Sequence, residues 1–197
     1  MLNINKDEKL INKALAGSQR SWVKLVKRYE NLIFNYCLRM TFQHSDAMDL
    51  MQEVFLAVYR NLPSYRGSGQ FKGWMMRIAA NKTTDFLRRR GRNPLHNASE
   101  VSDECFNSNN SQANQGFVPA HQDPASYHER HSKNQNILAM LSCLSQEQQL
   151  VIELKFFQHF TFEQISQQTN TSVSTIKTRF YAALTSLKND SEIKNVM

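Results

Sequence analysis

Apolar residues recur at three- and four-residue intervals through the first sixty residues, the spacing that gathers them on one face of an α-helix. One such stripe predicts a helix over about residues 22–37 and comprises Trp22, Leu25, Val26, Tyr29, Ile33, Tyr36 and Cys37. A second helix is expected from about Asp46 to Leu62, with Ser45 as its N-cap and Pro63 at its end. Its apolar face is expected to hold Leu50, Met51, Val54, Phe55 and Val58.

A third helix is predicted from Phe71 to about Arg90, after a loop, SYRGSGQ, that has the glycines and small polar residues of a turn. One face carries side chains that we interpret as packing residues: Phe71, Trp74, Met75, Ile78 and Phe86. A polar stripe lies beside it and comprises Arg77, Asn81, Thr84 and Arg88. The helix ends in RRRGR with little acid nearby, whereas exposed helix faces commonly carry charges of both signs. The stripe is therefore a candidate binding surface, and a solvated face remains the alternative.

The last sixty residues predict three more helices. Capping boxes open the first two, at Ser145 with Gln148 for SQEQQLVIELKFF and at Thr161 with Gln164 for the short FEQISQQT. The expected inward residues of the first are Leu150, Val151, Leu154 and Phe157. The third helix, STIKTRFYAALTSLK, should turn Ile176, Phe180, Leu184 and Leu187 inward. A short helix, a turn and a longer helix form the helix-turn-helix layout, which also occurs as a plain structural hairpin.

The middle of the chain differs in composition from both flanks. From Asn93 to about Lys133 it is rich in Asn, Ser, Gln, His and Pro and shows no apolar periodicity, which indicates a flexible tether. A loop of this length is unusual inside one compact domain. We therefore predict an all-α protein of two small helical domains, residues 1–94 and 136–197, joined by a flexible linker over residues 95–135.

Charge is unevenly distributed along the 197 residues, whose formal net charge is +7. Residues 60–92 include nine Lys and Arg residues, and the only acidic residue in this range is Asp85. Such a concentration favours a polyanionic partner such as nucleic acid, although a solvated basic face remains the alternative.

Other features narrow the class of protein. No apolar run reaches the length of a membrane span, and the start of the chain lacks the apolar core of a signal peptide, so we expect a cytoplasmic protein. Cys37, Cys105 and Cys143 are widely spaced and the histidines are scattered, so no metal site is predicted. Without a phosphate-cradling glycine loop, an HExxH motif or a nucleophile elbow, neither catalytic residues nor a cofactor are expected.

Taken in order, these segments resemble the two conserved domains, regions 2 and 4, of the extracytoplasmic-function (ECF) sigma factors. DLMQEVFLAVYRNLPSYRG is similar to the polymerase-binding helix of region 2 and the loop after it, and FKGWMMRIAANKTTDFLRRRGR to its promoter-melting helix. LSQEQQLVIELKFF, TFEQISQQT and SVSTIKTRFYAALTSLK resemble the three helices of region 4. The resemblance covers roughly residues 8–94 and 138–189.

The resemblance implies a factor that binds RNA polymerase core, recognises a −35 element as duplex and helps to open a −10 element. The implied partners are the clamp helices of the largest polymerase subunit, the polymerase flap, promoter DNA and an anti-sigma factor. Asp49, Gln52 and Glu53 match the polymerase-facing positions. Their charged and amide groups lie at one edge of an amphipathic helix, where plain solvent exposure is the alternative.

For the −10 element, Tyr65 and Asn81 correspond to positions that recognise a flipped base, through a stacking surface and an amide. Arg77, Arg88 and Arg89 would then hold phosphates. Lys72 is expected to be a further phosphate contact, and Arg90 and Arg92 are less specific candidates at an exposed basic end. For the −35 element, the resemblance implies that Lys177 and Thr178 occupy DNA-contacting positions. Lys can donate to guanine, and Thr can hydrogen-bond or touch a thymine methyl. Additional backbone or groove contacts are expected from Thr175, Arg179 and Tyr181.

Some residues depart from the family pattern. Thr169-Asn170-Thr171 stands where a Leu-Gly-aliphatic run is common, and Asn170 is expected to take the left-handed conformation that glycine would supply. Lys82 falls where the inward face should continue, so we expect its amine to extend past an apolar stem. Ala182 replaces a residue that is often basic, which weakens the expected −35 contact.

Two other classes of protein remain open. A DNA-binding regulator that acts without polymerase would use the same helix-turn-helix but would leave the first ninety residues unexplained. A protein-interaction adaptor would need the basic stretch only for solubility. Binding of polymerase core separates the sigma factor from both, and DNA binding without core separates the regulator from the adaptor.

Overall fold

The computed structural model describes residues 4–67, 71–91 and 136–196. The chain divides into two compact units, Met1–Arg92 and Asn93–Met197, each described here by itself. Every regular element in the described ranges is helical, which confirms the all-α prediction. The tether expected over residues 93–133, Arg92 and Cys105 lie outside the described residues.

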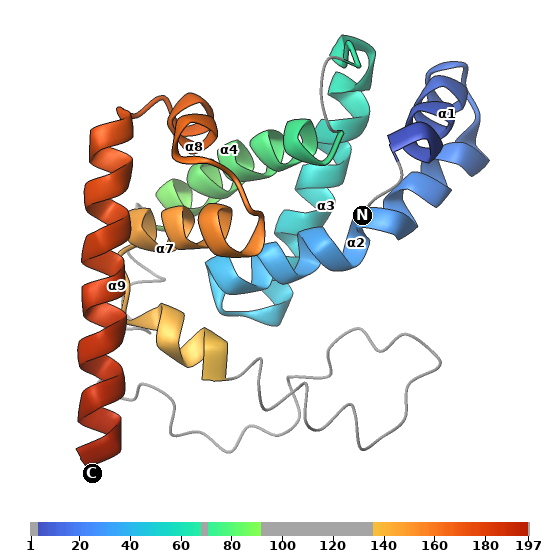
Figure 1. The fold of residues 1–197 in the computed structure, drawn as a ribbon. Coiled ribbons are helices and arrows are strands. Elements are labelled where there is room, and N and C mark those ends of the chain that lie inside the picture. The colour runs from blue at the N-terminus through green and yellow to red at the C-terminus, as the bar shows by residue number, and fades with distance from the viewer. Residues whose placement is uncertain (1–3, 68–70, 92–135, 197) are drawn as a thin grey trace. The chain divides into compact units, whose positions relative to one another are not determined.

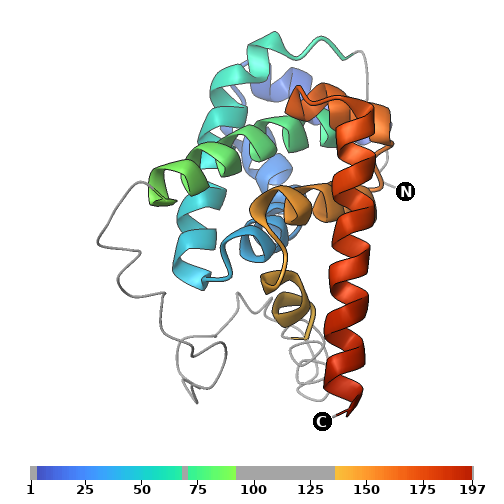
Figure 2. The same ribbon diagram turned by 90° about the vertical axis from the view of Figure 1, so that its left-hand side faces the viewer.

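The N-terminal unit contains α1 (Ile4–Leu15), α2 (Gln19–Thr41), α3 (His44–Asn61), the single turn η1 (Leu62–Ser64) and α4 (Phe71–Gly91). The long helix α2 packs against both α1 and α3, and α4 packs against α3 and, less extensively, α2 (Figure 1). In the rotated view α4 again lies across α3 (Figure 2). The end of α3, η1 and the start of α4 therefore lie at one end of this unit.

The core of the N-terminal unit follows the predicted stripes only in part. Most of the α2 stripe is buried, including Tyr29, Ile33 and Tyr36, but Trp22 and Val26 are half-buried. On α3, Leu50, Val54 and Val58 are buried whereas Met51 and Phe55 are half-buried. Phe86, expected to pack on α4, is also half-buried, because it lies near the end of that helix. Lys82 is half-buried, as expected for a stem that packs while its amine reaches water.

The start of α3 differs from the prediction. The helix begins at His44, its N-cap is Gln43, and no side chain caps it. Ser45 therefore lies inside the first turn, and its assignment as N-cap was wrong. The reversal that separates α2 from α3 is tight, because Phe42 adopts a left-handed conformation with φ 59° and leaves only Gln43 before the next helix. That backbone geometry was not visible in the apolar spacing.

Helix α1, which apolar spacing did not predict, is attached to α2 by a buried polar contact. Asp7 is buried, accepts a hydrogen bond of 2.6 Å from the Tyr29 hydroxyl and forms an ion pair with Arg28. Burial raises the pKa of Tyr29 well above its usual value, and the hydrogen bond and charge of Asp7 raise it further. Gly17, with φ +89°, provides the left-handed turn that reverses the chain between α1 and α2.

The C-terminal unit contains a helical segment over residues 136–142, α7 (Gln146–Ile152), the π-helical turn η2 (Glu153–Phe157), α8 (Phe162–Thr169) and α9 (Val173–Val196). Both predicted capping boxes are present, at Ser145 with Gln148 and at Thr161 with Gln164. Helix α9 is a long rod against which α7 and α8 pack (Figures 1 and 2).

The prediction of one regular helix through SQEQQLVIELKFF was wrong at its C-terminal end. Residues 151–154 are all buried, and four consecutive residues cannot share one face of a regular α-helix. The π-helical turn η2 accommodates part of this run, and Glu153 within it accepts a 3.0 Å hydrogen bond from Gln158 Nε2. A buried carboxylate is stabilised by such a partner.

The core around α9 combines predicted and unpredicted residues. Ile176 and Phe180 are buried as expected, whereas Leu184 and Leu187 are half-buried and Ala183 is buried completely. The small Ala183 side chain lies on the same face of α9 as Ile176. Asn170 adopts a left-handed conformation with φ 51° at the end of α8, which confirms the expectation for the turn.

Candidate nucleic-acid interface

An aromatic cluster forms where η1 leads into α4. Tyr65 caps η1, donating its backbone amide to the Leu62 carbonyl at 3.1 Å. The Tyr65 ring centroid lies 5.3 Å from that of Phe71 and 5.2 Å from that of Trp74. Phe71 is buried, but Tyr65 and Trp74 are half-buried, so part of the cluster faces solvent. Burial raises the pKa of Tyr65, and the nearby carboxylates of Glu8 and Asp7 add to that increase. The hydroxyl is therefore neutral at physiological pH.

The polar stripe on α4 extends from this aromatic cluster. At about 100° per residue, Trp74, Arg77, Asn81 and Arg88 fall within a sector of about 60° on the helix. Arg77 and Asn81 are exposed. Within the part of the chain that the structure describes, neither forms a hydrogen bond or an ion pair, so both side chains are available to a partner.

Three of the remaining cations considered as DNA contacts are paired with acids. Arg88 forms an ion pair with Asp85 at 2.8 Å, and Arg89 forms one with Glu53 at 3.1 Å. Lys72 is half-buried in the first turn of α4. A fourth cation, Arg90, pairs with Asp46 and is largely covered. Arg77 is therefore exposed and unpaired among the described residues, whereas Arg88 and Arg89 are exposed but already paired with carboxylates.

In the C-terminal unit, α8, the turn after Asn170 and α9 form the predicted helix-turn-helix. The Ser172 hydroxyl caps α9 by accepting the Thr175 backbone amide at 3.1 Å. Thr175, Lys177, Thr178 and Tyr181 are all exposed. Three of these, Lys177, Thr178 and Tyr181, share a sector of about 100° that faces away from the buried Ile176. The leading turns of α9 therefore present cationic, hydroxyl and aromatic groups on one surface.

Arg179 is placed differently from the other predicted −35 contacts. Its guanidinium pairs with Glu147 of α7 at 2.8 Å, and its side chain is mostly covered. It therefore connects α9 to α7, and only part of it is accessible to a phosphate. A role for Arg179 in positioning α9 fits this placement better than direct contact with a base.

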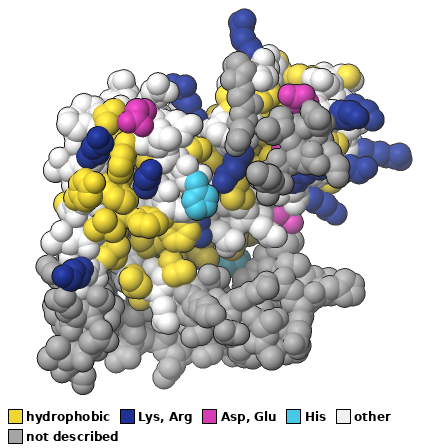
Figure 3. Space-filling view, in the orientation of Figure 1, with side chains coloured by type: hydrophobic (Ala, Val, Ile, Leu, Met, Phe, Trp, Pro, Cys, Tyr) yellow, Lys and Arg dark blue, Asp and Glu magenta, His cyan; other side chains and the backbone are white. Residues whose placement is uncertain are grey.

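An aromatic surface that the sequence analysis missed adjoins Lys177. Phe180 packs against Phe156 at 5.7 Å, Phe162 at 5.3 Å and Tyr181 at 5.5 Å, between ring centroids. Phe156 and Tyr181 remain 51% and 60% exposed. Figure 3 shows yellow hydrophobic side chains gathered over this unit, with Lys and Arg side chains among them. The run LKFFQHFTF was the available signal, since it is too aromatic for a solvated turn.

Charges surround this aromatic surface. The amines of Lys155 and Lys177 lie 4.6 Å and 5.9 Å from the centroid of the Phe162 ring. The pKa of the Glu163 carboxyl is lowered first by its own backbone amide, then by the Thr161 hydroxyl, with Lys177 and Lys155 contributing. The surface beside α9 is thus aromatic and cationic, with one carboxylate at its edge.

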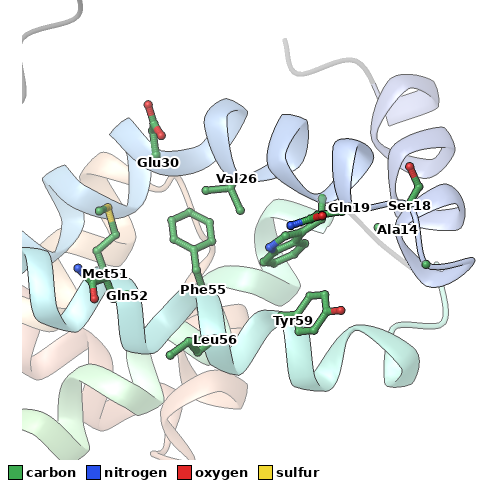
Figure 4. Close-up of a pocket in the computed structure, with 12 residues that line it drawn as sticks. Ala14, Ser18, Gln19, Val26, Glu30, Met51, Gln52, Phe55, Leu56 and Tyr59 are labelled. Atoms are coloured by element: carbon green, nitrogen blue, oxygen red, sulfur yellow. The ribbon is translucent and has the colours of Figure 1, made fainter.

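A groove of about 680 Å³ lies between α2 and α3 and reaches the end of α1. Val26 from α2 and Phe55 from α3 point toward one another across it (Figure 4). Trp22 and Tyr59 contact each other at one end, with ring centroids 5.0 Å apart. The groove explains why several predicted core residues are only half-buried, because their apolar stripes extend beyond the core.

The predicted polymerase contacts lie in different positions relative to this groove. Gln52 lines it beside Met51, Phe55 and Leu56. Asp49, which is exposed, lies three residues earlier on the same helix. Glu53 is half-buried and turned toward Arg89 of α4. Tyr59 and Leu56, both more than half exposed, extend the surface and were not selected from the sequence.

Within the described ranges, no cluster of three or more His, Cys, Asp or Glu residues could hold a metal ion. The helices described there are also too short or too polar to cross a membrane.

Comparison with protein families supports the interpretation of both units. The model of sigma-70 region 2 matches residues 25–93, and a model of sigma-70 region 4 matches residues 134–187. Together the two matches cover more than half of the chain. The first contains Tyr65, the α4 stripe and the α3 side of the groove, and the second contains the helix-turn-helix.

Curated proteins resemble the chain over almost its whole length. RNA polymerase sigma-H factor of Pseudomonas aeruginosa is 25% identical over 188 residues, which cover 93% of this chain and 92% of the relative. ECF RNA polymerase sigma-E factor of Escherichia coli is 25% identical over 184 residues, covering 93% of each chain.

Two solved structures share the fold. CnrH, in complex with the cytosolic domain of CnrY, superposes with a TM-score of 0.63 at 18% identity, covering 95% of this chain and 98% of that one. The sigma factor RpoE of Bartonella quintana, in complex with the anti-sigma factor NepR, superposes with a TM-score of 0.62 at 19% identity. The match covers 86% of this chain and 96% of that one. With both family models in order and full-length relatives of the same kind, the chain belongs to the sigma-70 family as an ECF-type sigma factor.

Proposed function

We propose that this sigma factor binds RNA polymerase core and directs initiation at promoters with a −35 duplex element and a −10 element that it helps to open. The observation that carries the proposal is the alignment of the half-exposed Tyr65–Trp74 cluster with the free side chains of Arg77 and Asn81 on α4. Residues 1–94 would act as region 2, residues 136–197 as region 4 and residues 95–135 as the linker.

At the −10 element, Tyr65 would stack on a base that has left the duplex. Stacking on an aromatic ring contributes about 1–3 kcal/mol per base, enough to offset much of the cost of unstacking. Asn81 supplies a donor and an acceptor to the edge of that base, and Arg77 contacts a neighbouring phosphate. Arg88 and Arg89 would reach phosphates by exchanging their present carboxylate partners.

At the −35 element, the leading turns of α9 would enter the major groove. Lys177 is placed to donate to guanine, and Thr178 to touch a thymine methyl or a phosphate. Thr175 and Tyr181 flank them as backbone contacts. Arg179, held by Glu147, supports the orientation of the helix.

The α2–α3 groove fits the polymerase itself. It combines an apolar floor with the polar side chain of Gln52, a pattern suited to an amphipathic helix, and the exposed Asp49 lies three residues before Gln52 on α3. The clamp helices of the largest polymerase subunit would occupy it, and the C-terminal unit would contact the flap. The relatives CnrH and RpoE were solved with partners that include an anti-sigma factor, so we expect such a protein to compete for these surfaces.

On this proposal the factor makes and breaks no bond itself, uses no cofactor and acts in the cytoplasm beside polymerase. Its contribution is selection of the start site and capture of the opened strand.

Run-off transcription tests the function. Purified bacterial core polymerase is supplied with a pool of promoter fragments, with and without the protein. Specific transcripts that require the protein are expected, and their start sites would show the promoter motif. If no transcripts form and core binding is not detected by gel filtration, the chain would instead be a DNA-binding regulator that acts without polymerase.

A further inference from the structure

Four lysines surround a hollow of about 430 Å³ on the outer side of the α1–α2 pair. Lys9 and Lys13 lie one turn apart on α1, and Lys24 and Lys27 lie one turn apart on α2. Leu10 and Arg28 complete the lining. Figure 3 shows Lys and Arg side chains in dark blue at the right of the view, where Figure 1 draws these two helices. We call Lys9, Lys13, Lys24 and Lys27 the lysine cluster.

No described residue forms an ion pair with the lysine cluster. All four lysines are exposed, and none of them is in an ion pair with another described residue. Arg28 is different, because Asp7 already neutralises it. Like charges one helical turn apart are mildly unfavourable for a helix. Four such ammonium groups around one hollow therefore favour an anionic partner over an empty surface.

A series of contacts joins Arg28, which lines the same hollow as the lysine cluster, to the aromatic loop. Arg28 pairs with Asp7, and Asp7 accepts the Tyr29 hydroxyl at 2.6 Å. The Tyr29 ring lies 5.6 Å from that of Phe71, which lies 5.3 Å from that of Tyr65. Helix α1 also contacts η1, the turn that Tyr65 caps. The lysine cluster and the proposed base-stacking ring thus belong to one packed assembly.

We propose that the lysine cluster holds phosphates of the same single DNA strand whose base is captured at Tyr65, where that strand leaves the loop toward α1. This inference rests on the proposed −10 function and extends it with a second phosphate contact surface besides α4. Lysines act as point charges that hold a backbone without selecting its sequence. The one guanidinium that lines the hollow, that of Arg28, is already paired with Asp7, so the lysines supply the free charge there.

The first test uses the full chain without polymerase. A fluorescein-labelled single-stranded oligonucleotide of mixed sequence is titrated by anisotropy across a salt series. The variants are Lys9→Gln/Lys13→Gln and Lys24→Gln/Lys27→Gln. Arg20→Gln/Arg60→Gln is the control, because it removes equal charge from exposed positions outside the hollow. Circular dichroism checks that all three remain folded.

Each phosphate contact contributes about 0.7 to the slope of log affinity against log salt for single strands, so each cluster variant should lower the slope by about 1.4. The control should leave it nearly unchanged. Cluster variants whose slopes match that of the control would overturn the proposal.

The second test uses holoenzyme and the non-template strand of a promoter identified by run-off transcription. The strand is lengthened by about six nucleotides at its 5′ or its 3′ end, within the span that single-strand grooves track. One of these two extensions should raise the affinity of the holoenzyme for the strand several-fold. This gain is expected with the wild-type chain and with the control variant, but not with the cluster variants. If the variants keep that gain and instead lose core affinity, the cluster binds an acidic protein surface and the proposal fails.

The two tests also separate this inference from the promoter function. A chain that yields no transcripts, but whose cluster variants lower the salt slope, would overturn the promoter function and support the lysine cluster as a single-strand contact. Normal transcription, with salt slopes and extension gain that the cluster variants leave unchanged, would support the promoter function and overturn the lysine cluster as a single-strand contact.

Discussion

Arg89 donates to both carboxylate oxygens of Glu53, with its Nη2 atom 3.1 Å and 3.3 Å from them. The contact joins α4 to α3, and it couples a residue proposed to hold DNA to one proposed to face polymerase. Both side chains are partly solvated, at 61% and 39% exposure, so the pair contributes little to stability. Its significance is that a partner taking one of these side chains frees the other.

A double-mutant cycle measures this pair. Glu53→Gln, Arg89→Gln and the double variant should show a coupling energy of no more than about 1 kcal/mol in urea unfolding, because the pair is exposed to solvent. The Asp85–Arg88 pair, also exposed, provides a matched cycle. A coupling energy above about 2 kcal/mol would show that the pair is structural.

Asn81→Ala should impair promoter opening more than core binding. Loss of an amide that contacts the captured base should reduce open complexes about tenfold, corresponding to roughly 1–1.5 kcal/mol for one hydrogen bond. Permanganate reactivity of the −10 thymines measures opening, and gel filtration with core measures binding. Thr84→Ala, on the same exposed stripe, is the control. A variant that loses core affinity yet opens promoters normally would contradict the assignment.

Lys177→Ala should weaken −35-dependent initiation several-fold, since a specific base contact contributes about 1–3 kcal/mol. The measurement compares transcription from promoters that differ only in the −35 element. Lys188→Ala is the matched control, because Lys188 is exposed three turns later on nearly the same side of α9. Unchanged selectivity between those promoters would remove Lys177 from the interface.

Tyr29→Phe should destabilise the protein at neutral pH by about 1.5–3 kcal/mol, because buried Asp7 loses a hydrogen bond. Burial raises the pKa of Tyr29, so the folded protein keeps a proton that the unfolded chain releases above about pH 10. Wild-type stability should therefore be unaffected by this group below pH 10 and fall above it. The variant should fall less steeply in urea unfolding, whereas Tyr59→Phe, at an exposed ring, should behave like the wild type.

Asn170→Gly should leave the stability of the C-terminal unit almost unchanged, and Asn170→Ala should lower it by about 1–2 kcal/mol. The reason is the left-handed φ of 51°, which glycine adopts freely and a Cβ-bearing residue other than Asn or Asp resists. Thermal unfolding followed by circular dichroism compares them with Gln167→Ala on the exposed face of α8. Equal destabilisation by both substitutions at position 170 would show that the Asn side chain, and not its backbone, is required.

The sequence by itself determined the helical class, the two capping boxes, the turn at Asn170 and the exposed faces of α4 and α9. These features depend on local chemistry. A three- and four-residue apolar period selects a helix and its buried side, and a hydroxyl followed three residues later by Gln satisfies the first amides of a helix. The family resemblance added the expected roles of residues on those faces.

Only the tertiary structure decided which apolar residues remain partly exposed and which charges are already paired. Trp22 and Phe55 belong to regular stripes, yet both line the groove between α2 and α3. Arg89 and Arg179 carry the charge expected of phosphate contacts, but Glu53 and Glu147 approach them from other helices. The lysine cluster likewise exists only because α1 packs beside α2. Such relationships depend on how helices distant in sequence pack together, which no periodicity within one helix can specify.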